Sequence, residues 1–131
     1  MPGRLGEHVT VDAKWWLWLV VACAGDAARS EDHAAEREAC NRGDGKACYE
    51  LGARYQLGVE TPRDLERAIA FWQRGCELGN APSCGQLGTV MEHGLAGRTR
   101  NLPVARRFYK RACDGGDPQA CRSLGVTAPD R

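Results

Sequence analysis

The chain has 131 residues, with 18 Lys and Arg against 17 Asp and Glu and a formal net charge of +1. This length fits one domain, and the charge balance gives no basis for a nucleic-acid partner. Leu, Ile, Val and Phe supply only 22 residues, 15 of them after residue 24, which excludes a core made mainly of large aliphatic side chains. The 18 Ala, 16 Gly and 7 Cys instead indicate closely packed helices, covalent cross-links, or both.

The first segment with a clear pattern is the apolar run WWLWLVVACA at residues 15–24. It is too short to cross a bilayer, which takes about 20 apolar residues in a helix. Because the run follows Arg4 and Lys14 and precedes small residues, it is typical of a secretory signal. We therefore predict a signal or lipoprotein signal segment at residues 1–24 and a mature domain at 25–131.

Two kinds of processing are compatible with this segment. The residues VVAC at 20–23 match a bacterial lipobox, in which Cys23 is acylated and becomes the first mature residue. The residues ACA at 22–24 also suit ordinary signal cleavage, and a short uncleaved apolar helix is a third interpretation. The lipobox predicts a periplasmic or outer-membrane lipoprotein of a bacterium, associated with a membrane through Cys23, and ordinary cleavage predicts a secreted protein.

The other six cysteines form three pairs with seven residues between partners, and the pairs recur at intervals of 36 and 37 residues. A fixed period of this length marks a repeat architecture. Alignment on the cysteines superimposes Leu51, Leu87 and Leu124, and also Gly52, Gly88 and Gly125. We predict complete units at about 48–83 and 84–120, with partial units at both ends.

Each unit has the pattern of two helices. Cys48, Leu51 and Tyr55 lie on one helical stripe, and Gly58 follows at a position that suits a left-handed helix end. The second helix follows a capping residue, which is Asp64 in one unit and Asn101 in the next, and in the first of these units it begins at Leu65. The short loops within units require antiparallel neighbours, so the predicted fold is all-α, a short α-solenoid of antiparallel helix pairs.

The turn between units decides how the cysteines pair. A glycine comes three residues after the first cysteine of each pair and can end one helix, and the Asp or Asn that follows can cap the next. Each turn therefore brings its two cysteines side by side and predicts disulfides Cys40–Cys48, Cys76–Cys84 and Cys113–Cys121 among the 15 possible connectivities. Structural zinc is the rival, but it needs four ligands at close spacing, so we predict neither metal nor cofactor.

Together these motifs resemble the Sel-1-like repeats, relatives of the tetratricopeptide repeats. The resemblance rests on Cys-x-x-Leu-Gly, the later Gly58 or Gly94, and an Ala-x-x-Phe-Trp/Tyr-x-Arg-x-Cys helix, and it covers about residues 32–125. The paired cysteines are similar to those of the exported branch typified by the Helicobacter cysteine-rich proteins. The resemblance implies a right-handed solenoid that serves as an interaction scaffold for a protein or peptide. This chain differs in having few repeats, and in Ala35 and Glu36 at the positions of Phe71 and Trp72.

Some cysteine-rich members of this family bind penicillin and hydrolyse β-lactams weakly, so a β-lactamase-like hydrolase is the alternative function. A serine β-lactamase needs Ser-x-x-Lys, and none of Ser30, Ser83 and Ser123 has that lysine. His33 and His93 lie in different units, which does not suit a zinc enzyme. We therefore predict no catalytic residue and a binding function in preference to an enzyme.

Two sets of side chains are candidates for binding. In tetratricopeptide-like stacks the first helices line the concave side, which predicts contacts from Glu50, Arg54, Gln86, Val90 and His93. The second set comes from a run between Arg98 and Arg111 that holds six basic residues and no acid. Within the run, Arg106 and Lys110 share one helical face, and Arg107 and Arg111 share another. We predict that Arg106, Arg107 and Lys110 dock to anionic lipid headgroups or to an acidic protein. The competing interpretation of this run is a solvated helix surface.

Overall fold

The computed structural model of the chain describes residues 33–125 and divides the chain into two compact units, Met1–Ala34 and Ala35–Arg131. All regular elements in the described residues are helices, as predicted. In chain order they are α2 (Ala34–Asn41), α3 (Gly45–Leu57), α4 (Leu65–Glu77), α5 (Ala81–His93), α6 (Leu102–Asp114) and α7 (Pro118–Ser123).

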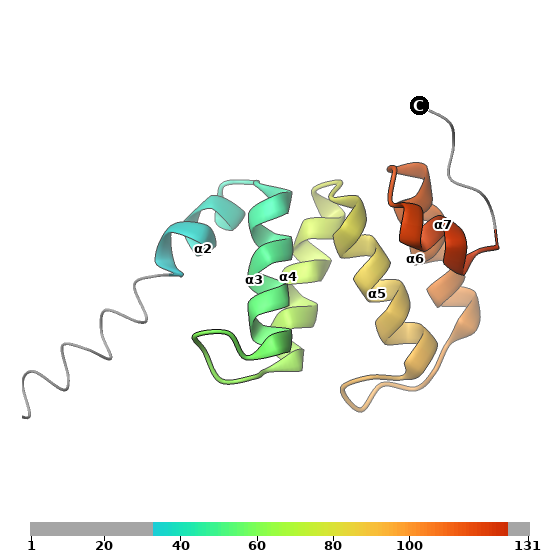
Figure 1. Cartoon of the computed structure of the whole chain (residues 1–131), viewed down its shortest axis with the longest axis horizontal. Coiled ribbons are helices and arrows are strands. Elements are labelled where there is room, and N and C mark those ends of the chain that lie inside the picture. The colour runs from blue at the N-terminus through green and yellow to red at the C-terminus, as the bar shows by residue number, and fades with distance from the viewer. Residues whose placement is uncertain (1–32, 126–131) are drawn as a thin grey trace, which may run out of the picture. The chain divides into compact units, whose positions relative to one another are not determined.

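The second unit is a stack of antiparallel helix pairs in two layers (Figure 1). Helix α3 pairs with α4 and α5 pairs with α6, while α4 also packs on α5 and α6 on α7. In the view of Figure 1, α4 and α6 lie behind α3 and α5. Helix α3 also touches α5, whereas α4 and α6 approach each other less closely. The layer of α3 and α5 is therefore the inner, concave side of the stack, and α7 is the equivalent helix of the next repeat.

The three turns between pairs have the same structure, which explains the constant cysteine spacing. Gly43, Gly79 and Gly116 have φ values of 105°, 86° and 97°, which side-chain-bearing residues rarely adopt. In the middle turn the Asn80 N–H donates to the Gly75 carbonyl at 2.9 Å, which closes a Schellman motif. The three predicted disulfides close these turns, with Cα–Cα distances of 4.8, 4.7 and 4.7 Å.

The predicted helix caps are confirmed. The side chain of each N-cap residue accepts a hydrogen bond from the first helical turn at Asp44, Asp64, Asn80, Asn101 and Asp117. The long inner helices end at Gly58 and Gly94, both left-handed with φ of 70° and 63°. Helix length is thus set locally, by a capping side chain at one end and a glycine at the other.

Aromatic side chains pack directly on glycines of the neighbouring helix and form the centre of the core. A Cβ on Gly52 would overlap the indole of Trp72, and one on Gly88 would overlap the ring of Tyr109. Both aromatic residues are buried, with 1% and 7% exposure. Small residues on α3 and α5 therefore let the aromatic rings of α4 and α6 fill a core that has few large aliphatic side chains.

No helix within residues 33–125 is both long and apolar enough to span a membrane. The predicted signal segment and Cys23 lie outside the described residues.

Candidate interaction surface

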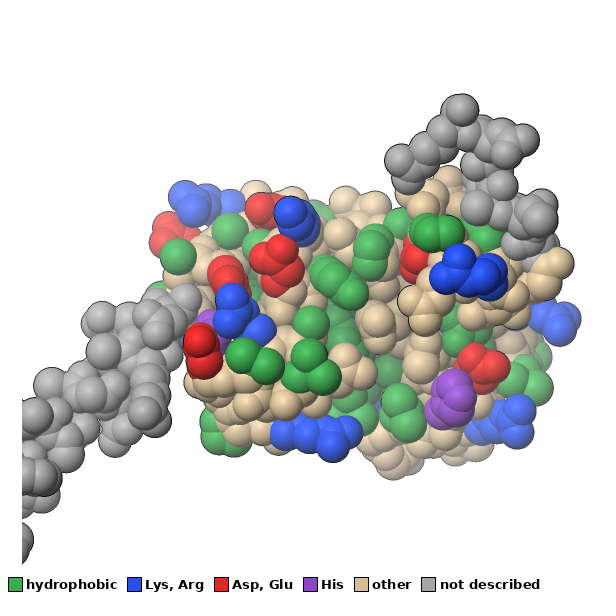
Figure 2. All heavy atoms as spheres, in the orientation of Figure 1, with side chains coloured by type: hydrophobic (Ala, Val, Ile, Leu, Met, Phe, Trp, Pro, Cys, Tyr) green, Lys and Arg blue, Asp and Glu red, His purple; other side chains and the backbone are tan. Residues whose placement is uncertain are grey.

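The concave layer presents a row of polar side chains that recur at the repeat interval. Glu50 on α3, Gln86 on α5 and Ser123 on α7 occupy equivalent positions, and each is at least partly exposed. Figure 2 looks onto this layer and shows charged groups gathered toward the two ends of the stack, with mainly apolar and uncharged groups between them. The middle of the face therefore suits hydrogen bonding and apolar contact more than ion pairing.

A polar niche lies where α5, α6 and α7 meet. The Tyr109 hydroxyl donates to Glu92 at 2.5 Å and lies 3.2 Å from the Thr89 hydroxyl. Burial, followed by the hydrogen bond to Glu92, raises the pKa of Tyr109 above its usual value. A small cavity of about 30 Å³ adjoins this cluster, and Gln86 and Ser123 are among the residues that line it.

This niche was not predicted from the sequence. The signal that could have revealed it is the exchange of Trp72 for Tyr109 at equivalent positions, because a buried phenol hydroxyl, which can both donate and accept, requires hydrogen-bond partners in its own repeat. Thr89 and Glu92 provide the partners. The indole nitrogen of Trp72 is buried and has no such partner among the described residues.

The residues predicted as concave contacts differ in their exposure and in their ion pairs. Glu50 and Gln86 are partly or fully exposed on the concave helices, and the Glu50 carboxylate lies 4.0 Å from the Lys46 ammonium group. Arg54 is only partly exposed, and its guanidinium pairs with Glu36 of α2 at 2.9 Å and with Glu60 at 3.5 Å. We therefore assign Arg54 mainly to the junction of α2 and α3.

The prediction that Val90 is an exposed contact is wrong, because its side chain is only 1% exposed and belongs to the main core. Val90 is equivalent to Arg54 one repeat earlier, so one register position holds an ion pair near α2 and an apolar contact in the middle of the stack. His93 is exposed at the end of α5, and its Nδ1 lies 3.0 Å from the Thr89 carbonyl oxygen.

The basic residues from Arg98 to Arg111 divide into structural and free groups. Arg98 makes a two-pronged contact with Glu66, both distances being 3.2 Å, and so joins the loop before α6 to α4. Arg111 donates to the Cys76 carbonyl at 3.0 Å. Of the four remaining basic residues, Arg100 lies in the loop before α6, whereas Arg106, Arg107 and Lys110 lie together in the middle of α6. The docking hypothesis is therefore reduced to a surface centred on these three.

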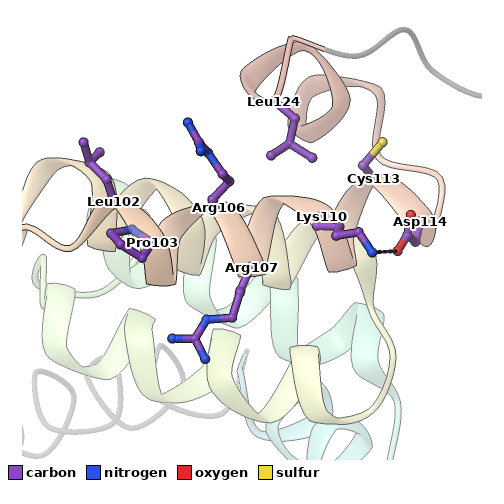
Figure 3. Close-up of a pocket in the computed structure, with 8 residues that line it drawn as sticks. All are labelled: Leu102, Pro103, Arg106, Arg107, Lys110, Cys113, Asp114 and Leu124. Atoms are coloured by element: carbon purple, nitrogen blue, oxygen red, sulfur yellow. Dashed lines mark ion pairs between the residues drawn. The ribbon is translucent and has the colours of Figure 1, made fainter.

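Those residues border a groove of about 810 Å³ between α6 and the end of α7 (Figure 3). Figure 3 shows Leu102 and Arg106 on the side of α6 that faces Leu124, whereas Arg107 points to another side of the helix. The complete lining consists of Leu102, Pro103, Arg106, Arg107, Lys110, Cys113, Asp114 and Leu124. We call this hollow the end groove.

The charges of the end groove are only partly balanced. Lys110 lies 4.0 Å from Asp114, and both side chains are largely exposed, so this pair is weak. Arg106 and Arg107 are exposed and have no ion-pair partner within residues 33–125. The groove thus combines apolar walls with cationic groups that are open to solvent.

The described residues offer little for catalysis by an activated serine. Ser83 has no exposed surface, and its hydroxyl donates to the Asn80 side chain at 2.7 Å. The Ser123 hydroxyl donates to the Gln119 carbonyl at 3.2 Å. In the part of the chain from 33 to 125, no three His, Cys, Asp or Glu side chains form a group suited to a metal ion.

The repeat register, the paired cysteines and the glycine–aromatic packing correspond to a known repeat. The Sel1 repeat matches residues 45–80 and 81–117, which together make up more than half of the chain. The chain belongs to the Sel1 repeat family. The two matches begin at the first residues of α3 and α5, slightly before the units predicted from the cysteines.

Solved structures of Sel1 repeat proteins share the fold. Helicobacter pylori cysteine rich protein B is 27% identical, with a TM-score of 0.66 over 72% of this chain and 71% of that one. A Sel1 repeat protein from Oxalobacter formigenes is 26% identical, with a TM-score of 0.65 over 76% of this chain and 80% of that one. A protective antigen of uropathogenic Escherichia coli is 31% identical, with a TM-score of 0.64 over 74% of this chain and 22% of the antigen.

One curated relative is cytochrome c oxidase assembly factor 7 of Danio rerio, which is 36% identical over 61 residues. The match covers 45% of this chain and spans only 27% of that relative. The similarity therefore concerns a part of each chain rather than the whole relative.

The three disulfides indicate the compartment in which these Sel1 repeats function. All six cysteines of the repeat region are paired, one pair in each turn between helix pairs. Disulfides persist in oxidising surroundings and are rare in the reducing cytosol. The molecule is therefore suited to an oxidising compartment outside the cytoplasm.

Proposed function

We propose that the protein is an exported scaffold that binds a protein or peptide along the concave face of α3, α5 and α7. The observation that carries this proposal is the row of equivalent polar side chains, Glu50, Gln86 and Ser123, which the fold leaves accessible at the repeat interval. The polar niche below the row adds Thr89 and Glu92. An extended ligand segment presents hydrogen-bonding groups at regular intervals, so a periodic row of side chains suits it.

Site-specific photocrosslinking tests this proposal. A photoreactive residue at Gln86 is expected to capture a discrete protein in the native cell envelope, and a matched residue at Gln73, exposed on α4 in the other layer, is not. Equal capture from the two positions, or capture from neither, would contradict binding on the concave face.

A labelled penicillin separates this function from the hydrolase alternative. A scaffold is expected to remain unlabelled and to leave the β-lactam intact. Stoichiometric covalent labelling or measurable turnover would favour a hydrolase, and mapping the label would identify the nucleophile.

We also propose that the exported form is anchored through acylation of Cys23, because VVAC at residues 20–23 matches the lipobox pattern. Metabolic labelling with a lipid precursor is expected to mark the wild-type chain and not Cys23→Ser. Label retained on Cys23→Ser would exclude attachment at that residue and favour ordinary cleavage.

A further inference from the structure

Part of the end groove lies at positions that the preceding repeat buries or packs against its core. Arg106 is equivalent to Ile69, which is 1% exposed, and Leu124 is equivalent to Leu87, which is 2% exposed. Leu102 is 48% exposed, whereas its equivalent, Leu65, packs against the main core. The groove therefore includes part of a helix-packing site, and an arginine stands where the preceding repeat has an apolar residue of that site.

That replacement determines what the groove can hold. A purely apolar occupant would cover the Arg106 guanidinium without offering it an anion, and burial of an unpaired charge is costly. An occupant with a carboxylate at its edge pairs with Arg106 while an apolar side chain contacts Leu102 and Leu124. The Arg106 guanidinium is available, since no described carboxylate pairs with it.

The shape of the site distinguishes between the two acidic partners that the basic residues suggest. An anionic membrane surface attracts exposed basic side chains and needs neither a hollow nor an apolar wall. Here the cationic groups border a hollow of about 810 Å³, and Leu124 faces Arg106 across it (Figure 3). A hollow of this kind fits an inserted side chain better than a plane of headgroups.

We propose that the end groove binds an acidic segment of a partner protein that inserts an apolar side chain between α6 and Leu124. This second surface is separate from the concave face, and its function does not depend on the proposed concave site. The Arg106 guanidinium provides charge complementarity, and the leucines provide the apolar contact area.

Binding of a synthetic acidic peptide, with two leucines at helical i, i+4 spacing flanked by glutamates, tests the proposal. The measurement is nuclear magnetic resonance titration of the isotope-labelled mature protein. We expect amide shifts that centre on Leu102 to Lys110 and on Leu124. Absence of shifts in α6, or shifts confined to the concave helices, would overturn the proposal.

Two matched pairs of exposed substitutions separate the groove from general electrostatics. Arg106→Glu is expected to weaken peptide binding about tenfold or more, whereas Arg63→Glu, an equal charge change near the start of α4, leaves it within about twofold. Leu102→Ser is expected to weaken binding, whereas Leu57→Ser, at the end of α3, is not. Equal effects within either pair would refute a specific groove.

Two further experiments test whether the end groove binds a membrane instead, and whether the peptide binds at the concave face instead. The first uses vesicles of phosphatidylglycerol. If they bind the wild type but not Arg106→Glu, and the wild type does not bind the peptide, the surface is a membrane site and the proposal is overturned. Substitution of Gln86 by Arg on the concave face is expected to leave peptide binding unchanged. Loss of peptide binding in that variant would place the peptide on the concave face instead.

Discussion

Gly75 on α4 and Ser83 on α5 form a contact that allows the packing between repeats to be tested by a double-mutant cycle. A Cβ on Gly75 would overlap the Ser83 hydroxyl and lie 2.9 Å from the Ser83 Cβ. Ser83 has no exposed surface and its backbone is fixed in the first turn of α5, so it cannot move away. The equivalent contacts on either side hold two alanines each: Ala39 with Ala47, and Ala112 with Ala120.

The expected magnitudes follow from this geometry. Gly75→Ala overpacks the contact at a cost of about 1–3 kcal/mol, partly offset by about 1 kcal/mol of improved helix propensity. Ser83→Ala loses a hydrogen bond worth about 0.5–1.5 kcal/mol and leaves Asn80 still bonded to the Ser83 N–H, at 2.9 Å. The gain in helix propensity cancels in the cycle, because it is the same with serine or alanine at position 83. We therefore expect the double variant to lose about 1–2 kcal/mol less free energy of unfolding than the two single variants lose together.

Urea unfolding under non-reducing conditions, followed by far-ultraviolet circular dichroism, measures the four free energies of unfolding. Ala120→Ser, with and without Ala112→Gly, is the matched control at the next turn, where the glycine is expected to relieve the strain caused by the serine. If the two substitutions add within about 0.5 kcal/mol at both turns, the argument that a larger side chain on one helix requires a smaller one on its neighbour is refuted.

Two other predictions concern the disulfides and the polar niche. Replacement of both Cys76 and Cys84 by Ala opens a loop of about nine residues and should lower the free energy of unfolding by about 2.6 kcal/mol, measured by urea unfolding; an unchanged midpoint would contradict the chain-entropy argument. For Tyr109 the raised pKa means that the folded state favours the neutral phenol, so its contribution to stability is complete below a pH of about 10 and is lost as the pH rises through the folded pKa. Tyr109→Phe should therefore show a weaker fall in stability between about pH 9 and pH 11 than the wild type, and equal slopes would show that the niche does not titrate with folding.

Local chemistry made the helices and turns predictable from sequence. Asp44 and Asn80 cap helices because a side-chain oxygen reaches free N–H groups within its own turn, and Gly79 ends a helix because it tolerates positive φ. These interactions join residues only a few positions apart. The cysteine pairs follow from them, since each pair flanks one turn.

The candidate site was less predictable, because the repeat register gives a residue its position but not its partners. Arg54 and Val90 share one register position, yet Glu36 of α2 holds the first and the core surrounds the second. The sequence predicted a row of basic side chains, but it did not show that Arg98 and Arg111 are occupied by Glu66 and the Cys76 carbonyl.

The sequence by itself determined the period, the helix ends, the disulfide partners and the family, because all of these depend on contacts within a turn or on self-similarity along the chain. Only the tertiary structure decided which equivalent positions are buried and which remain open. Ile69 and Arg106 show the difference: one register position is core in the middle of the stack and part of a groove near α7. The physical reason is that burial depends on neighbours brought together by stacking, and these neighbours differ from repeat to repeat.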